Sequence, residues 1–113
     1  MQGEPGSGRV ADLLPFARIS AVNLGEVAAK LHDYGLSESL IAQELATFEL
    51  PVVPFDEQHA LRSGFLRALS RSAGLSMGDR ACIATAELSE AIVVTGDRIW
   101  ASLELPVTIE IIR

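Results

Sequence analysis

Three acidic residues lie where an α/β fold would place its chemistry. Glu26 lies one short loop beyond the β-friendly stretch 18–22, and Asp97 lies two residues beyond the apolar stretch 91–95. Asp79 lies in the first turn of a predicted helix. Functional residues in parallel α/β sheets gather beyond the carboxyl ends of the strands. The sequence therefore allows these three acids, which are far apart along the chain, to meet in one cleft.

A shared cleft would give the three carboxylates a common ligand. Carboxylates that crowd together raise one another's pKa unless a cation lies between them. Oxygen ligands with no His or Cys nearby favour magnesium or manganese over zinc or copper. Such a site suits phosphodiester hydrolysis, in which the metal lowers the pKa of a water and stabilises charge on phosphate oxygens. Glu26, Asp79 and Asp97 are therefore candidate metal ligands.

The same acids also have a purely structural interpretation. Asn23 to Glu26 and Ser76 to Asp79 each have capping-box spacing, in which the acid satisfies a free backbone N–H and complements the helix dipole. Such a cap contributes about 1 kcal/mol without any chemistry. Asp97 can likewise cap the helical turn that follows it. Taken singly, Glu26 and Asp79 are more typical of caps than of ligands, so their combination carries the functional interpretation.

The elements that must position these acids alternate along the chain. Strands are expected at 18–22, 51–55, 91–95 and 107–112, and helices over 23–35, 38–48, 57–74 and 77–90. Helices of ten or more residues between strands are typical of a parallel sheet sandwiched by helices, because a parallel connection must cross over. The predicted fold class is α/β, as one three-layer domain over residues 1–113.

Local signals set the expected helix ends and faces. The predicted N-caps are Ser37, Asp56 and Ser76, and the predicted helix stops are Gly35 and Gly74. In the third helix, Leu61, Phe65 and Leu69 recur four apart and are expected to face the core. His32 and His59 are interpreted as surface or interface residues, and Cys82 as a small buried hydrophobe.

Composition limits the function classes. The 113 residues are 49% apolar and 5% aromatic, which predicts one domain with an aliphatic core. The net charge is −6, and Lys30 is the only lysine among nine basic residues. An acidic domain repels phosphate backbones, so a nucleic-acid role must run through metal ions or a small arginine cluster. No apolar run approaches a membrane span and no signal-peptide pattern opens the chain, so a cytoplasmic protein is expected.

Four segments in order resemble a known family. The segments "ISAVNLGEVAAKL", "VVPFD", "AGLSMGDRACIATA" and "IVVTGDRIW" closely resemble the PIN-domain ribonuclease toxins of bacterial toxin–antitoxin systems, the VapC-like family. The resemblance covers nearly the whole chain. It implies a parallel sheet flanked by helices and a hydrolase that cuts RNA with one or two magnesium or manganese ions.

The resemblance also implies roles for particular residues. Acids matching Glu26, Asp79 and Asp97 would hold the metal that activates water. Thr95 and Asn23 match polar positions that support such a site. Arg80 and Arg98 directly follow two of the acids, and each would contact phosphate or an antitoxin carboxylate, or remain a solvated arginine near a helix start. The family also implies a homodimer and a small cognate antitoxin that covers the cleft.

The sequence departs from the family at its beginning. Family members open with an apolar strand that carries the first catalytic aspartate, followed by a helix and a Gly-Glu-Pro-Gly turn. Here "GEPG" occupies residues 3–6, directly after Met1 and Gln2. The first, central strand is therefore expected to be absent, which would leave a gap between strands 18–22 and 91–95 with unpaired backbone groups.

Two explanations of this departure stay open, and they lead to two function hypotheses. If Met1 is a false start, the native chain is an active metal-dependent endoribonuclease toxin. If the chain is a truncated remnant, it acts as a catalytically inactive module that binds an antitoxin or an intact toxin. A phosphoacceptor receiver domain is a poor third, because such domains need a lysine beyond a late strand and Lys30 lies on an early helix.

Overall fold

The chain folds into helices and short parallel strands. The computed structural model describes residues 7–71 and 73–112. Its helices are α1 (Ser7–Leu13), η1 (Leu14–Phe16), α2 (Ala21–Asp33), α3 (Glu38–Thr47), α4 (Glu57–Phe65), α5 (Arg67–Ser70), α6 (Met77–Leu88) and η2 (Arg98–Ser102). Its strands are β1 (Ile19–Ser20), β2 (Val52–Val53), β3 (Val93–Thr95) and β4 (Ile109–Ile111). The predicted α/β class is confirmed, and the GEPG segment lies outside the described residues.

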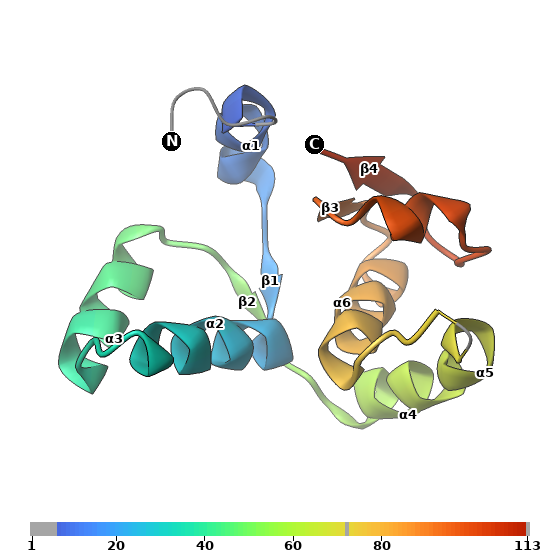
Figure 1. Ribbon diagram of the computed structural model, residues 1–113, viewed down its shortest axis with the longest axis horizontal. Coiled ribbons are helices and arrows are strands. Elements are labelled where there is room, and N and C mark those ends of the chain that lie inside the picture. Colours follow the sequence, from blue (N-terminus) through green and yellow to red (C-terminus); the bar gives the residue numbers. More distant parts are fainter. Residues whose placement is uncertain (1–6, 72, 113) are drawn as a thin grey trace.

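The described strands form two separate parallel pairs and not one continuous sheet. Strand β1 pairs with β2, with Ile19 opposite Val52, and β3 pairs with β4, with Val93 opposite Ile109. Figure 1 shows β1, β2, α2 and α3 on one side of the molecule and β3, β4, α4 and α6 on the other. Within the described residues no strand joins β1 to β3. The expectation of a single sheet is corrected for the described residues, while the expected absence of a first strand stays a prediction.

The first strand is shorter than predicted because α2 begins earlier. The Ser20 hydroxyl accepts a hydrogen bond from the Val22 N–H at 3.1 Å, so Ser20 is the N-cap and the helix starts at Ala21. Asn23 and Glu26 therefore lie inside the helix. The predicted capping box between Asn23 and Glu26 is wrong. Glu26 therefore does not cap α2.

The third predicted helix is interrupted. It divides at Leu66 into α4 and α5, two residues after Gly64, the weakest helix former in this segment. Leu66 is 1% exposed and faces the core, whereas the predicted apolar face of Leu61, Phe65 and Leu69 is 51%, 65% and 51% exposed. That face is wrongly predicted, because α4 packs against α6 through the side containing Ser63 and Leu66.

The core lies around α6. A buried cluster contains Leu66, Ile83, Ala84, Ala86, Val93 and Trp100, and residues of the C-terminal segment such as Val107 and Ile109 pack against it. Small residues on α6 let it contact α2, α4, β1 and β3 at the same time. Helix α6 is therefore the element that holds the two strand pairs in one molecule.

The predicted caps are confirmed. The side chains of Ser37, Asp56 and Ser76 each accept a backbone N–H at the start of α3, α4 and α6. Gly35 has a φ of 94°, the left-handed conformation that lets the chain leave α2. Gly74 has a φ of 69° but follows a helix that already ends at Ser70, so the predicted stop at Gly74 is wrong.

Of the two histidines, His32 is exposed as expected, but the side chain of His59 is only 12% exposed. Its Nδ1 lies 2.7 Å from the Asp56 carboxylate, and this hydrogen bond is the main reason that the pKa of Asp56 is lowered. His59 is therefore not an exposed surface residue, while the interface alternative stays a prediction.

Candidate functional site

Glu26 is held against the first turn of α6. It lies in the second turn of α2, where its Oε1 accepts a hydrogen bond of 3.0 Å from the Asn23 amide. The same Asn23 nitrogen donates to the Gly78 carbonyl at 3.0 Å and so ties α2 to α6. A Cβ at position 78 would overlap the Glu26 carboxylate. The close approach of Glu26 therefore requires a glycine at this position.

Asp79 forms the predicted capping box of α6. The Ser76 N–H donates to Asp79 Oδ2 at 2.9 Å, and the Asp79 N–H donates to Ser76 Oγ at 3.1 Å. Asp79 follows Gly78 directly, and the charges of Asp79 and Glu26 both act on the Cys82 thiol. Burial, followed by the charges of Asp79 and Glu26, raises the pKa of the Cys82 thiol to about 11. Cys82 is thus a neutral, largely buried thiol, as its structural interpretation predicts.

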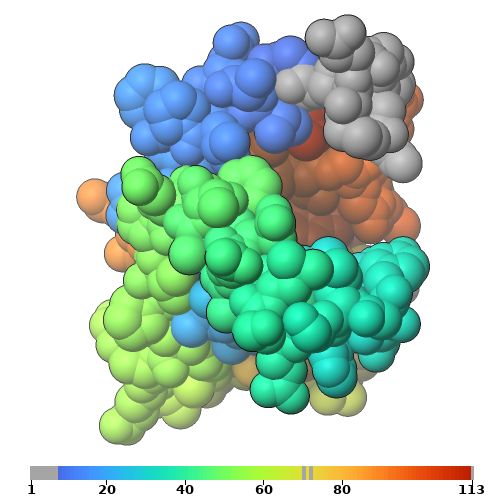
Figure 2. Space-filling view, turned by 90° about the vertical axis from the view of Figure 1, so that its left-hand side faces the viewer, coloured from blue at the N-terminus to red at the C-terminus, as the bar shows by residue number. Residues whose placement is uncertain are grey.

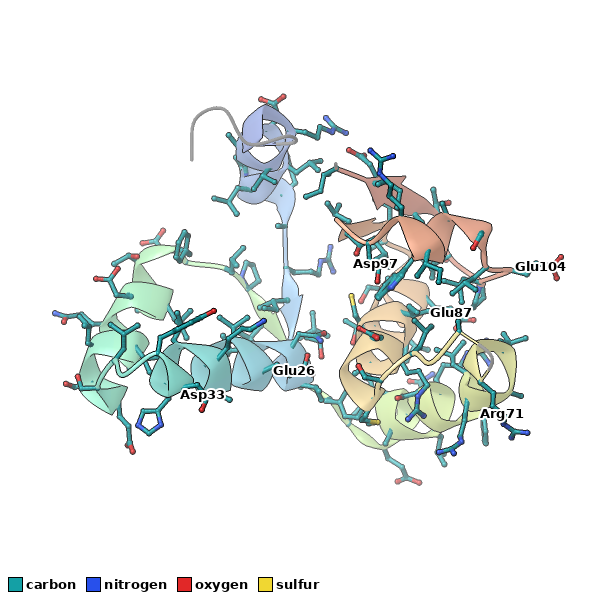
Figure 3. All side chains as sticks on the ribbon, in the orientation of Figure 1. Glu26, Asp33, Arg71, Glu87, Asp97 and Glu104 are labelled. Carbon is teal, nitrogen blue, oxygen red and sulfur yellow. The ribbon has the colours of Figure 1, made fainter. Side chains whose placement is uncertain are left out.

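Asp97 caps the turn after β3. Its Oδ1 accepts a hydrogen bond of 3.1 Å from the Ile99 N–H, at the start of the helical turn that contains Trp100. The Thr95 hydroxyl accepts the Asp97 N–H at 3.1 Å and fixes the backbone on which Asp97 is carried. Figure 3 shows Glu26 on α2 and Asp97 beyond β3, well separated in that view. Among the described residues, Glu26 and Asp79 therefore lie in the region of Cys82, and Asp97 does not complete a group of three acids with them.

The ligand atoms of the candidate residues suit a hard divalent cation, but their arrangement in space does not form a complete site. Glu26 and Asp79 offer carboxylate oxygens, the type of ligand that magnesium and manganese prefer. Within residues 7–71 and 73–112, no group of three His, Cys, Asp or Glu side chains is placed to hold a metal ion. Two carboxylates alone do not make a metal site, so a cation-binding role for Glu26 and Asp79 is a proposal and not an observed feature of the described residues.

The two candidate arginines have different surroundings. Arg80 is half-buried and donates from Nη1 to the Ser63 carbonyl at 3.2 Å, which fastens α6 to α4. This contact is not among the roles predicted for Arg80. One guanidinium nitrogen binds a backbone carbonyl of the protein itself. Arg98 is exposed and opens η2 beside Asp97.

A cleft opens between the two strand pairs. Its volume is about 540 Å³, and β1, β3, α6 and the η1 segment all line it. In Figure 2 the surface is hollowed between α1 and the α2–α3 pair, with the C-terminal part of the chain at the back of the hollow. Asn23 also lines this cleft, so the cleft reaches the neighbourhood of Glu26.

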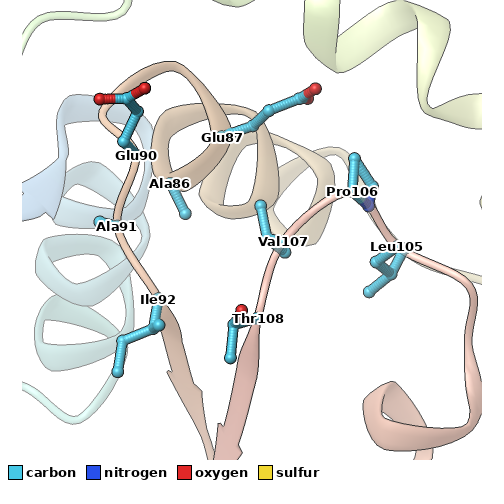
Figure 4. Close-up of a pocket in the computed structure, with 9 residues that line it drawn as sticks. All are labelled: Ala86, Glu87, Glu90, Ala91, Ile92, Leu105, Pro106, Val107 and Thr108. Carbon is cyan, nitrogen blue, oxygen red and sulfur yellow. The ribbon is translucent and has the colours of Figure 1, made fainter.

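A second hollow lies at the amino ends of β3 and β4. It measures about 510 Å³ and is lined by residues that include Ala86, Ile92, Leu105 and Val107. Figure 4 shows the Glu87 carboxylate turned away from it at the rim. Ligands of α/β sheets bind beyond the carboxyl ends of the strands. This hollow lies at the amino ends of β3 and β4, so it is not the candidate site.

Family comparison agrees with this architecture. The PIN domain family matches residues 1–104, and the chain belongs to that family. PIN domains are generally metal-dependent nucleases, which places the chain among the hydrolases at a coarse level. No curated protein matches the chain. None of the described helices is long and apolar enough to cross a membrane.

The sequence analysis missed Gly78 as a site residue. Its requirement follows from the packing of Glu26 against it, which no local pattern encodes. The only local signal is a glycine in the first turn of a helix, where a better helix former would be expected.

Proposed function

We propose that the chain is a magnesium- or manganese-dependent endoribonuclease toxin of a toxin–antitoxin pair. The observation that carries the proposal is the contact of Glu26 with the first turn of α6. Glu26 has no capping role, yet its carboxylate is held by Asn23 against Gly78, and its charge acts together with that of Asp79 on Cys82. A fold that holds an acid near a second acid without a structural reason supports a cation-binding role.

The candidate site residues have distinct roles in this proposal. Glu26 and Asp79 hold the ion, and Asn23 orients the Glu26 carboxylate through the hydrogen bond described above. Asp97, whose backbone Thr95 fixes, lies apart from these two acids and is not assigned to the ion. When bound, the ion lowers the pKa of a water molecule and stabilises the negative charge that develops on the phosphate oxygens. Arg98, at the start of η2, contacts an RNA phosphate or an antitoxin carboxylate. The proposed partners of the protein are RNA, a cognate antitoxin and a second copy of the chain.

The test is Glu26→Gln, because glutamine keeps the shape and the hydrogen bond from Asn23 but is a poor ligand for magnesium. We expect an unchanged unfolding midpoint and RNA cleavage reduced by about 100-fold or more. Glu44→Gln, a matched change on the exposed face of α3, serves as the control and is expected to leave cleavage intact. Equal cleavage by wild type and Glu26→Gln would remove Glu26 from the site.

A second candidate is a catalytically inactive PIN module that binds an antitoxin or an intact toxin. The observation in its favour is that the described acids do not form a group of three. A ligand that prefers the folded state must raise the melting temperature. Millimolar magnesium or manganese that leaves the melting temperature unchanged would favour this module over the nuclease.

A further inference from the structure

We propose that two copies of the chain associate through complementary helical surfaces, with α3 of each copy packed on α4 and α5 of the other. The exposed side of α4 and α5 supplies the first observation. Its apolar side chains are Leu61, Phe65 and Leu69, which recur four residues apart and are 51%, 65% and 51% exposed. Single exposed apolar side chains are ordinary, whereas a row of them bordered by charge marks an interaction site.

The charge around these side chains differs from that of the whole chain. Residues 61–71 contain three arginines and no acid, in a protein with a net charge of −6. Arg62 is half-buried and bonded to Glu87 on α6, while Arg67 and Arg71 are exposed. Phenylalanine and arginine are enriched at protein interfaces, and lysine, which this segment lacks, is depleted. We call Leu61, Phe65, Leu69, Arg67 and Arg71 the α4–α5 surface.

Helix α3 has the opposite charge. Residues 38–49 contain three exposed glutamates, Glu38, Glu44 and Glu49, and no basic residue. Leu40 and Phe48 are 37% and 55% exposed, and their four-residue spacing places them on the same side of the helix as Glu44. We call these five residues the α3 surface.

The two surfaces are complementary in both charge and polarity. When they pack together, the apolar side chains of each are covered by those of the other, and the glutamates of α3 come to lie beside Arg67 and Arg71. Opposite charges across an interface steer two partners together and fix their register. The exposed leucines and Phe65 favour a protein over a nucleic acid as the occupant, because a phosphate backbone gives them no apolar surface to contact.

The contact must join two molecules. Within one copy α3 packs against α2, and Figure 1 shows α3 and α5 at opposite ends of the molecule. Helix α3 therefore cannot reach the α4–α5 surface of its own chain. Both surfaces belong to helices in the lower part of that view, so two copies related by a two-fold axis can form both contacts at once.

This inference names the surfaces through which the second copy in the proposed function binds, and it does not rest on nuclease activity. Neither surface includes Glu26 or Asp79. Glu26→Gln, which tests the nuclease, should leave the association unchanged. The two proposals can therefore fail separately.

Sedimentation of the full chain measures the association. At about 50 µM we expect a species of twice the monomer mass, because interfaces of standard size reach micromolar affinity or better. A chain that is monomeric at this concentration overturns the proposal.

Two variants and their mixture identify the contacting surfaces. Phe48→Lys adds a positive charge that would face Arg67 and Arg71, and Phe65→Glu adds a negative charge that would face the glutamates of α3. Each variant alone should raise the dissociation constant by about tenfold or more. An equal mixture should regain the affinity of the wild type. One contact of the mixed pair is unaltered, and the other brings the two introduced, opposite charges together.

Val10→Lys is the matched control, because Val10 is an exposed residue of α1 outside both surfaces. It should keep the dissociation constant of the wild type, and circular dichroism should show that all three variants are folded. A mixture that associates no better than the single variants overturns the proposal. So does a Phe48→Lys variant that dimerises as tightly as the wild type, because α3 would then not be the occupant.

Discussion

At the residue scale, the three carboxylates that the sequence analysis treats alike as candidate ligands make different contacts in the structure. Asp79 and Asp97 each accept a backbone N–H that opens a helical segment. Glu26 caps nothing and is directed by Asn23 toward the first turn of α6. A cap is satisfied by its own helix, whereas the Glu26 carboxylate has capacity left for a ligand. Glu26 is for this reason the most informative of the three acids.

The contact between Glu26 and Gly78 gives a prediction. In Gly78→Ala the added Cβ occupies the position of the Glu26 carboxylate, so Glu26 must move while α6 keeps its capping box. We expect RNA cleavage to fall by about tenfold or more, with the free energy of unfolding changed by less than about 1 kcal/mol. Urea unfolding and a cleavage assay measure the two effects.

Gly64→Ala is the control for this change. Gly64 lies in α4 and has nothing within 4 Å of an added Cβ. It should gain about 0.5–1 kcal/mol of stability and keep its cleavage rate, because alanine is the better helix former. If Gly78→Ala cleaves RNA as fast as Gly64→Ala does, the position of Glu26 is irrelevant to activity.

At the element scale, the N-terminal helix spans the two halves of the molecule. Through η1 it continues into β1, and through Arg9 it reaches β4. Arg9 Nε lies 2.5 Å from Glu110 Oε2, and Arg9 Nη2 lies 3.0 Å from Glu110 Oε1, a bidentate pair between residues far apart in the sequence. Helix α1 thus lies at the edge of the cleft, held by one ion pair on the β4 side.

This ion pair gives a pH-dependent prediction. The hydrogen bond from Arg9, aided by its charge, lowers the pKa of Glu110. A carboxyl with a lowered pKa contributes stability that is present above the unfolded pKa and lost as pH falls through the folded pKa. We therefore expect α1 to detach from β4 in acid, below the ordinary pKa range of a glutamate, and in Glu110→Gln already at pH 7.

Amide chemical shifts of residues 8–13 measure the detachment by NMR. Glu104→Gln is the matched control, since Glu104 is an exposed acid of the same C-terminal segment. It should leave the shifts and their pH dependence unchanged. Shifts in α1 that do not respond to Glu110→Gln would show that other contacts hold the helix.

At the scale of the whole molecule, burial is distributed unevenly. The buried cluster belongs to α6, β3, η2 and Leu66, the residue that follows α4. In the half that contains α2, α3, β1 and β2, the buried residues are Ile41 and Ser20. The two halves meet mainly through α6, and the cleft separates their strands. The C-terminal half should therefore be the more stable one.

Hydrogen exchange tests this asymmetry. Amides of residues 81–86 and 93–95 should exchange more slowly than those of residues 21–33, because opening of the N-terminal half exposes less apolar surface. Leu66→Ala should cost about 2–5 kcal/mol, and Ile41→Ala should fall at the low end, near about 2 kcal/mol. Uniform protection across both halves, or a larger loss from Ile41→Ala, would contradict an asymmetric core.

Local chemistry determined which elements form. The caps at Ser37, Asp56 and Ser76 and the stop at Gly35 were predictable because each acts within one helical turn of its own position. The alternation of strands and helices likewise predicted the α/β class. The start of α2 was missed, since Ser20 and Asn23 are both good caps and the sequence does not rank them.

Tertiary packing decided the rest. The buried side of α4 contains Ser63 and Leu66 because α6 lies against it, which overrides the four-residue spacing of Leu61, Phe65 and Leu69. The contact of Glu26 with Gly78 likewise depends on residues that are far apart along the chain. The same holds for the lack of pairing between β1 and β3 among the described residues. Local patterns encode what one turn can satisfy by itself, whereas contacts between elements depend on which surfaces remain to be covered.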